Sequence, residues 1–166
     1  MSKPAKVRGV EWQTVSTANC SVQRTLDVVG EKWSLLVLRD TFNGVRRFED
    51  LRRHVGVSEP VLADRLRTLV AAGILATRPY RETGRRERAE YVVTDRGWEL
   101  QPVVVGLLQW GDRHLADDAG PPVEVRHRAC GHRAEAVVRC TADGQVLAPS
   151  DTELVEGPGL LPAATG

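Results

Sequence analysis

The sequence lacks the marks of several large classes of protein. It contains no apolar run long enough for a membrane-spanning helix, and its N-terminus has no signal-peptide core. Its three cysteines, an odd number at uneven spacing, do not match the framework of a secreted disulfide-rich domain. A Gly-rich phosphate loop, a nucleophile elbow and paired carboxylates framed by histidine are also missing. We therefore expect a cytoplasmic protein that has no membrane partner and is not an enzyme.

What the sequence does contain suits one globular domain with a small appendage. Of its 166 residues, 42% are hydrophobic and 27% are charged. The net charge of +1 hides an asymmetry: residues 1–110 hold 18 Lys and Arg against 13 Asp and Glu, whereas residues 111–166 hold 5 against 9. A basic first part suits a polyanionic partner. Surface charges that only keep a protein hydrated can give a similar net charge. The positions of the arginines are therefore a stronger indication of a polyanionic partner than the net charge.

The chain is organised around residues 46–88. A short helical pattern in this stretch ends at Gly56. Ser58 then takes the N-cap position of a second helix, and Gly73 lies where that helix should end. Three apolar residues of the second helix recur at the i, i+4, i+7 spacing of one buried face: Leu62, Leu66 and Leu69.

Two strand-like segments follow the second helix. They cover residues 74–77 and 89–93 and are joined by a turn at residues 82–85. A helix, a turn, a second helix and a two-stranded ribbon, in this order, form a winged helix-turn-helix. The fold class that we expect is therefore mainly α with a small β wing (α+β).

Helices are also predicted on both sides of this stretch, at residues 20–29 and 31–40 before it and after the ribbon. The inner face of the 31–40 helix should carry Trp33, Leu36 and Val37. Thr94 is the N-cap of the helix after the ribbon, which should reach Leu115 with a kink at Pro102.

The helix after the ribbon carries an apolar stripe that a domain this small must cover. The stripe consists of Trp98, Val103, Leu107 and Trp110. We expect the same helix of a second copy to cover it, because two-fold DNA sites commonly match two-fold proteins. A fold-back onto its own domain, which would leave a monomer, is the alternative.

The expected domain organisation follows from these patterns. It comprises a flexible N-terminal arm at 1–19, a DNA-binding and dimerisation domain at 20–117, a linker at 118–122, a small β appendage at 123–150 with strands at 123–125 and 134–138, and a disordered tail at 151–166.

The appendage contains two turns with the spacing of a zinc knuckle. His127 and Cys130 precede one glycine, and Cys140 and Asp143 precede another. Histidine, cysteine and aspartate are all zinc ligands, and glycine after the second ligand permits the tight turn. A short β-hairpin appendage like a degenerate zinc ribbon, with these four ligands, is one interpretation. Plain β-hairpins and reduced thiols that bind no metal are the alternatives.

The second helix of the central stretch should bind DNA in the major groove. With Leu62 pointing inward, its outer face meets base edges. Arg65 and Arg67 suit guanine or phosphate, and Asp64 suits a cytosine amine or orients an arginine. A solvated face with a surface Asp64–Arg67 ion pair is the alternative. The residues predicted to bind DNA here are Ser58, Pro60, Val61, Asp64, Arg65, Arg67 and Thr68.

The ribbon tip is rich in arginine, with only Glu82 and Glu87 to offset the charge. Clustered arginines repel one another, so an anionic partner explains them, with the ribbon along the phosphates or in the minor groove. A loop that is merely soluble is the alternative. The arginines predicted to contact DNA outside the second helix are Arg46, Arg47, Arg81, Arg85, Arg86 and Arg88.

Several motifs in their order resemble one known family. They are CSVQRTLDVVGEKWSLLVLRD, RRFEDLRR, SEPVLADRLRTLVAAGIL, YVVTDRG and QWGD, which together span residues 20–112. This stretch is similar to the HxlR-type, MarR-related winged helix-turn-helix regulators. The resemblance implies a homodimeric repressor or activator that acts near its own gene. It also implies that a cysteine at the start of the first helix, here Cys20, senses oxidants or electrophiles.

The switch is expected outside the central stretch. Cys20 should lie in the first turn of a helix, where the helix dipole and Arg24 favour the thiolate that a sensor needs. A small buried residue at the dimer seam is the alternative. Trp33, Trp98 and Trp110 either line an apolar pocket for a small-molecule effector or belong to the core.

These observations favour a homodimeric, sequence-specific DNA-binding transcriptional regulator, a repressor, which is switched by an effector or by thiol oxidation. It needs no cofactor to bind DNA. Two alternatives stay open. One is a protein-interaction module that uses the winged helix without DNA, and the other is a redox-active or metal-active protein centred on Cys20 or on the C-terminal cysteines and histidine.

Overall fold

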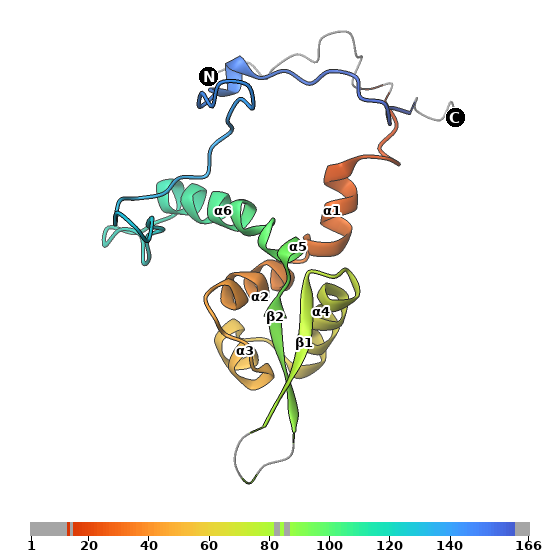
Figure 1. The fold of residues 1–166 in the computed structure, drawn as a ribbon, viewed down its shortest axis with the longest axis vertical. Coiled ribbons are helices and arrows are strands. Elements are labelled where there is room, and N and C mark those ends of the chain that lie inside the picture. The colour runs from red at the N-terminus through yellow and green to blue at the C-terminus, as the bar shows by residue number, and fades with distance from the viewer. Residues whose placement is uncertain (1–12, 14, 82–83, 85–86, 162–166) are drawn as a thin grey trace. The chain divides into compact units, whose positions relative to one another are not determined.

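The computed structural model describes residues 13, 15–81, 84 and 87–161 (Figure 1). The chain divides into two compact units, one of residues 26–135 and the other of residues 1–25 with 136–166. Residues 1–12, 14 and 162–166 of the predicted arm and tail lie outside the described residues. No helix in the described part of the chain is long and apolar enough to span a bilayer.

Three helices form the centre of the larger unit: α2 (Lys32–Phe42), α3 (Phe48–Val55) and α4 (Glu59–Ala71). Gly56 ends α3 in the left-handed conformation at φ 73°, and Gly73 follows α4 at φ 70°, where a side chain would be strained. Ser58 is the N-cap of α4 with extended backbone, although its side chain makes no capping hydrogen bond. The predicted helix ends at Gly56 and Gly73 are confirmed.

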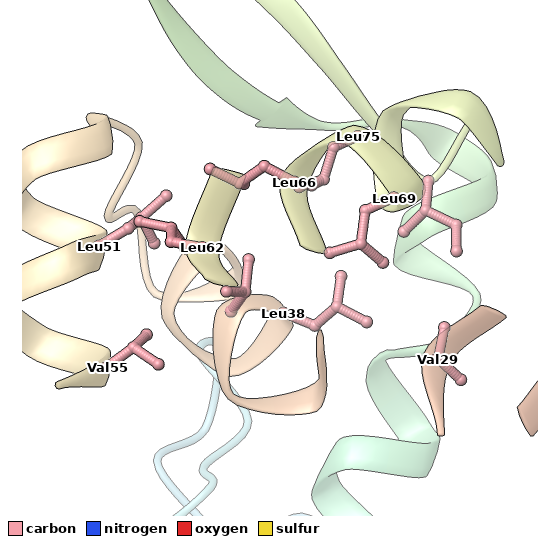
Figure 2. Close-up of a cluster of buried hydrophobic side chains, with 10 residues drawn as sticks. Val29, Leu38, Leu51, Val55, Leu62, Leu66, Leu69 and Leu75 are labelled. Carbon is pink, nitrogen blue, oxygen red and sulfur yellow. The ribbon is translucent and has the colours of Figure 1, made fainter. Parts of the chain in front are cut away.

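The buried core lies between these helices and the first strand (Figure 2). The predicted inner face of α4 is confirmed, because Leu62, Leu66 and Leu69 are fully buried. On α2 the prediction is confirmed for Val37, whereas Trp33 and Leu36 only pack partly buried against the core. The largest fully buried side chains among the described residues are Ser34, Val37, Leu38, Asp40, Leu51, Leu62, Leu66, Leu69 and Leu75.

The wing is an antiparallel ribbon of β1 (Leu75–Tyr80) and β2 (Arg88–Val93). Its register pairs Leu75 with Val93 at the base and Tyr80 with Arg88 towards the tip. The residues before α3 join its edge, because Arg46 O accepts a hydrogen bond from Tyr91 N at 2.8 Å. β1 is longer than predicted, and its Pro79 is tolerated because a two-stranded ribbon has only edge strands.

The prediction of a single helix with a kink at Pro102 is wrong. The chain instead forms α5 (Asp95–Trp98) and α6 (Gln101–His114). Thr94 caps α5 as predicted, since its Oγ1 accepts a hydrogen bond from Gly97 N at 3.1 Å. Pro102 lies in the first turn of α6, where its missing N–H and its fixed φ cost nothing. The proline therefore starts a second helix rather than bending one helix.

The strands predicted at residues 123–125 and 134–138 are also wrong. Residues 123–148, all of them described, contain two turns that are each closed by an isolated bridge, Arg126 with Arg133 and Arg139 with Val146. An isolated pair of short strands is marginally stable in water, and here each pairing is limited to one bridge. The structure therefore does not show the predicted β-hairpin that resembles a zinc ribbon.

The smaller unit contains the start of α1 (Ser21–Val29) and the end of the described chain. Ser16 N donates to Leu161 O, and the Asn19 side-chain amide donates to Gly159 O, both at 2.9 Å. A 3-10 turn, η2 (Pro149–Asp151), precedes this segment. The domain boundaries inferred from the sequence stay predictions.

Candidate nucleic-acid interface

The face of α4 opposite its buried leucines is open to solvent. Ser58, Pro60, Val61 and Arg67 are exposed, while Asp64, Arg65 and Thr68 are half-buried. The Thr68 hydroxyl donates to the Asp64 backbone oxygen one turn earlier at 3.1 Å, so its proton is engaged within the helix. The structure thus brings all seven predicted residues to one helix, with the apolar Pro60 and Val61 in its first turn and the charged residues behind them.

The charged residues of this face are joined to one another. Asp64 Oδ1 accepts from Arg67 Nη1 at 3.0 Å, and Asp64 Oδ2 accepts from Arg65 Nη2. The sequence indicates the Asp64–Arg67 pair through its i, i+3 spacing. It gives no signal for Arg65, whose contact with the neighbouring Asp64 depends on its rotamer.

The wing presents further arginines. Arg81 follows β1 and Arg88 begins β2, and both are exposed. Arg85 and Arg86, also predicted to contact DNA, lie outside the described residues. Arg78 is held across the ribbon by Glu90, whose Oε1 accepts from Arg78 Nε at 2.7 Å. The sequence gives no signal for this pair, because Arg78 and Glu90 become neighbours only through the strand register.

Arg46 and Arg47 connect the wing to the helix-turn-helix. Both are exposed, and Arg47 is the N-cap of α3. The Arg47 guanidinium lies 4.7 Å from the centre of the Tyr80 ring, a cation–π contact, and Arg47 forms an isolated bridge with Glu90. Tyr80 is not among the site residues that the sequence predicts. An aromatic residue next to the arginine-rich tip is nevertheless a signal of a possible contact with an arginine. These contacts fix the wing relative to α3.

A buried carboxylate fixes α2 against α3. Asp40 is 2% exposed, and its Oδ2 lies 2.6 Å from His54 Nδ1 while Oδ1 accepts from Arg39 Nε at 2.8 Å. A buried carboxylate is costly unless it is paired, and here it has two partners. The sequence gives no signal for this cluster, because Asp40 and His54 are on different helices.

The three candidate tryptophans of the effector pocket have different neighbours. Trp98 stacks on Phe42 with ring centres 5.0 Å apart, and Trp110 lies 5.1 Å from the ring of His114. Trp33 packs against the core, with Lys32 Nζ over its ring. Trp98 and Trp110 are each about half exposed. The predicted effector pocket stays a prediction.

All three cysteines are free thiols. Cys20 lies one residue before α1, not in its first turn as predicted, although its backbone oxygen already accepts from Arg24 N at 3.0 Å. The Arg24 guanidinium donates to Asn19 Oδ1 at 3.2 Å. Cys20 therefore occupies the N-cap position of α1.

The candidate zinc ligands lie in the two turns. His127 Nδ1 is 3.1 Å from Cys130 Sγ, and the backbone N–H of Gly131 closes this turn on His127 O at 2.8 Å. In the other turn a hydrogen bond from Gln145 N, and a second from Cys140, lower the pKa of Asp143. Within the described residues no three His, Cys, Asp or Glu side chains are grouped as metal ligands. Zinc binding stays a prediction from the sequence.

A model of the HxlR-like helix-turn-helix family matches residues 28–119, more than half of the chain. The chain belongs to this family. The match covers α2 to α6 and includes the whole wing. The match confirms the family resemblance that the motifs indicate. The HxlR-like protein is a transcriptional regulator with a helix-turn-helix fold.

The curated relatives of this HxlR-like protein carry the same class of name. Rv3095 of Mycobacterium tuberculosis, named as an uncharacterised HTH-type transcriptional regulator, is 42% identical over 139 residues, which cover 84% of this chain and 87% of Rv3095. YdeP of Bacillus subtilis, similarly named, is 27% identical over 107 residues, covering 64% and 82%.

Solved structures agree with the fold. The crystal structure of PA1607, a candidate transcription factor, matches with a TM-score of 0.71 at 36% identity, over 82% of this chain and 94% of PA1607. The oxidised form of HypR, described as a redox regulator, matches with a TM-score of 0.54 at 31% identity, over 59% of this chain and all of HypR.

Proposed function

We propose that this HxlR-like protein represses transcription by binding a specific DNA operator as a homodimer. The observation that carries the proposal is the solvent-exposed face of α4, which presents Pro60, Val61, Asp64, Arg65 and Arg67 on a helix held rigidly by three buried leucines. A rigid helix with charged and apolar side chains on its free face suits the major groove.

In this proposal the two parts of the interface have different tasks. Pro60 and Val61 contact thymine methyl groups, and Arg65 and Arg67 donate to guanine. Arg81 and Arg88 of the wing bind phosphates or enter the minor groove, together with Arg46 before α3. The wing therefore supplies affinity for any sequence, and α4 supplies discrimination between sequences.

A mobility-shift experiment tests the proposal. DNA from upstream of the protein's own gene is titrated with the protein, once with an excess of the same unlabelled DNA and once with a scrambled duplex as competitor. We expect the unlabelled DNA to abolish the shift and the scrambled duplex to leave it. If no specific shift occurs with either reduced or oxidised protein, the alternative of a protein-interaction module is favoured.

The homodimer is supported by α6, which has no buried residue. Its Val103, Leu107 and Trp110 are each about half exposed, as is the neighbouring Trp98. An apolar helix face of this kind marks an interaction surface on a protein that stays in solution. A second copy is the partner that also matches a two-fold operator. The exposed tryptophans of the same face would then offer an effector apolar surface at the dimer seam.

Placing a charge on this face should separate the copies. Leu107→Glu introduces a carboxylate that a buried seam cannot solvate, so we expect a monomer by sedimentation at concentrations at which the wild type is a dimer. Arg113→Glu, an exposed change on the same helix, is the matched control and should leave the dimer intact. A Leu107→Glu protein that sediments like the wild type would contradict the dimer seam.

The switch that we propose is oxidation of Cys20. The thiol lies at the N-terminus of α1, and the chain is similar to HypR, which is described as a redox regulator. We expect diamide to abolish operator binding by the wild type and to leave binding by Cys20→Ser unchanged. Cys130→Ser and Cys140→Ser are the controls and should remain sensitive. Equal loss of binding in Cys20→Ser would exclude this thiol, and a small-molecule effector would then be the remaining switch.

A further inference from the structure

One acidic side chain lies among the arginines on the free face of α4. Asp64 uses both carboxylate oxygens, one for Arg67 Nη1 at 3.0 Å and the other for Arg65 Nη2. The two arginines differ in exposure, since the side chain of Arg65 is 24% exposed and that of Arg67 is 73% exposed, with Asp64 between them at 47%. A single carboxylate thus connects a half-buried arginine side chain to an exposed one.

Folding stability does not account for this arrangement. Ion pairs at this degree of exposure contribute little to the stability of a folded protein, because water screens them and holding long side chains costs entropy. For a surface that only has to attract DNA, the carboxylate is unfavourable, because it cancels one of two positive charges and repels phosphate. The observation therefore needs an explanation in terms of which DNA is bound.

The geometry supplies that explanation. A guanidinium has five N–H donors in a rigid plane, so a contact to Asp64 leaves donors on both arginines for base edges. Because the carboxylate already orders both side chains, less conformational entropy is lost when they meet matching acceptors. On DNA of another sequence, the negative charge of Asp64 remains close to base edges that cannot donate a hydrogen bond to it, and binding is weaker. A cytosine amine can donate such a hydrogen bond.

We propose that Asp64 is a specificity-determining residue that positions Arg65 and Arg67 as one donor array and weakens binding to DNA that does not match this array. The inference rests on the proposed function, in which α4 enters the major groove. Asp64 thus lowers the affinity for DNA of any sequence and, by doing so, increases the discrimination between sequences.

The test uses Asp64→Asn, which removes the charge and keeps the size of the side chain. The wild-type protein first selects duplexes from a randomised library, and the most enriched duplex and a scrambled version of it are then the two probes. Fluorescence anisotropy at several salt concentrations gives the affinity of the full-length wild type and variant for each probe. We expect Asp64→Asn to bind the scrambled probe more tightly and its specificity ratio to fall about fivefold or more.

A change in salt dependence accompanies this fall. Arginines released from Asp64 can reach phosphates, so the slope of log affinity against log salt for the scrambled probe should steepen by about 0.9 for each additional phosphate that an arginine neutralises. Glu49→Gln is the matched control, because Glu49 pairs with Arg52 at 3.0 Å on α3 and its loss also removes one exposed carboxylate. We expect the control to leave the specificity ratio unchanged.

The outcomes are distinguishable. If the wild type enriches no sequence, the proposed function fails and this inference falls with it. If the wild type discriminates and Asp64→Asn discriminates equally well, or if Glu49→Gln lowers the ratio by the same factor, only the role of Asp64 is overturned. Asp64→Ala, which substitutes a better helix former, serves as a second variant and should give the same fall in specificity.

Discussion

Replacing Arg81 and Arg88 together with alanine should weaken binding to every DNA sequence by a similar factor. Both side chains are exposed at the open end of the wing, where Tyr80 and Arg88 form the last pair of the ribbon. Removing two cations affects the binding of phosphates and not of base edges, so the operator and a scrambled duplex should lose affinity equally. The loss should be larger at low salt than at high salt.

The salt titration is the measurement that checks this result. The slope of log affinity against log salt should become shallower by about 0.9 for each phosphate that the variant no longer neutralises, which counts twice in a dimer. Arg113→Ala, an exposed arginine on α6 away from the wing, is the control and should leave the slope unchanged. An unchanged slope in the Arg81→Ala/Arg88→Ala protein would remove the wing from the interface.

Replacing Gly97 with alanine should destabilise the fold by about 2 kcal/mol or more, because the added methyl overpacks a filled space. A Cβ at this position would lie 2.2 Å from Ile74 O and 2.9 Å from Val93 Cγ1. Ile74 O cannot move away freely, since it also accepts hydrogen bonds from Thr94 N at 3.1 Å and Thr94 Oγ1 at 3.0 Å. The substitution therefore disturbs the junction of the wing with α5.

Urea denaturation of Gly97→Ala and of a matched variant measures this effect. Gly111 lies within α6 and a Cβ there would have no neighbour within 4 Å, so Gly111→Ala should be neutral or stabilising by about 0.4–1 kcal/mol. The two variants make the same chemical change in opposite packing environments. Equal stability of both proteins would show that the close approach of Gly97 to Ile74 is not a constraint.

The parts of the fold that the sequence predicts are those set by local patterns. Leu62, Leu66 and Leu69 are buried because their spacing places them on one helix face, and Gly73 follows α4 because only glycine adopts its backbone conformation without strain. The same logic failed at Pro102, where a proline in an apolar helical pattern has two interpretations, a kink or a new first turn. Periodicity alone does not separate them.

The parts that the sequence does not predict depend on contacts between distant residues. The Arg78–Glu90 pair depends on strand register, and the Asp40–His54 pair depends on how α3 packs on α2. Neither register nor packing is encoded at fixed spacing, so both pairs became visible only in the folded chain. The placement of the predicted residues of α4 and of Arg81 and Arg88 on the wing is observed, whereas Arg85 and Arg86 lie outside the described residues. The contacts of all these residues with DNA stay predictions.

Hydroxyl-radical footprinting on a duplex selected by the wild-type protein is the most direct test of the central claim that two copies place α4 in successive major grooves. The account predicts two protected regions related by two-fold symmetry, with centres one helical turn or a multiple of it apart, each turn being about 10 base pairs. It also predicts that Arg81→Ala/Arg88→Ala loses protection beside each region. A duplex bound at saturation with a single unsymmetrical protected region, or with no protection, would contradict it.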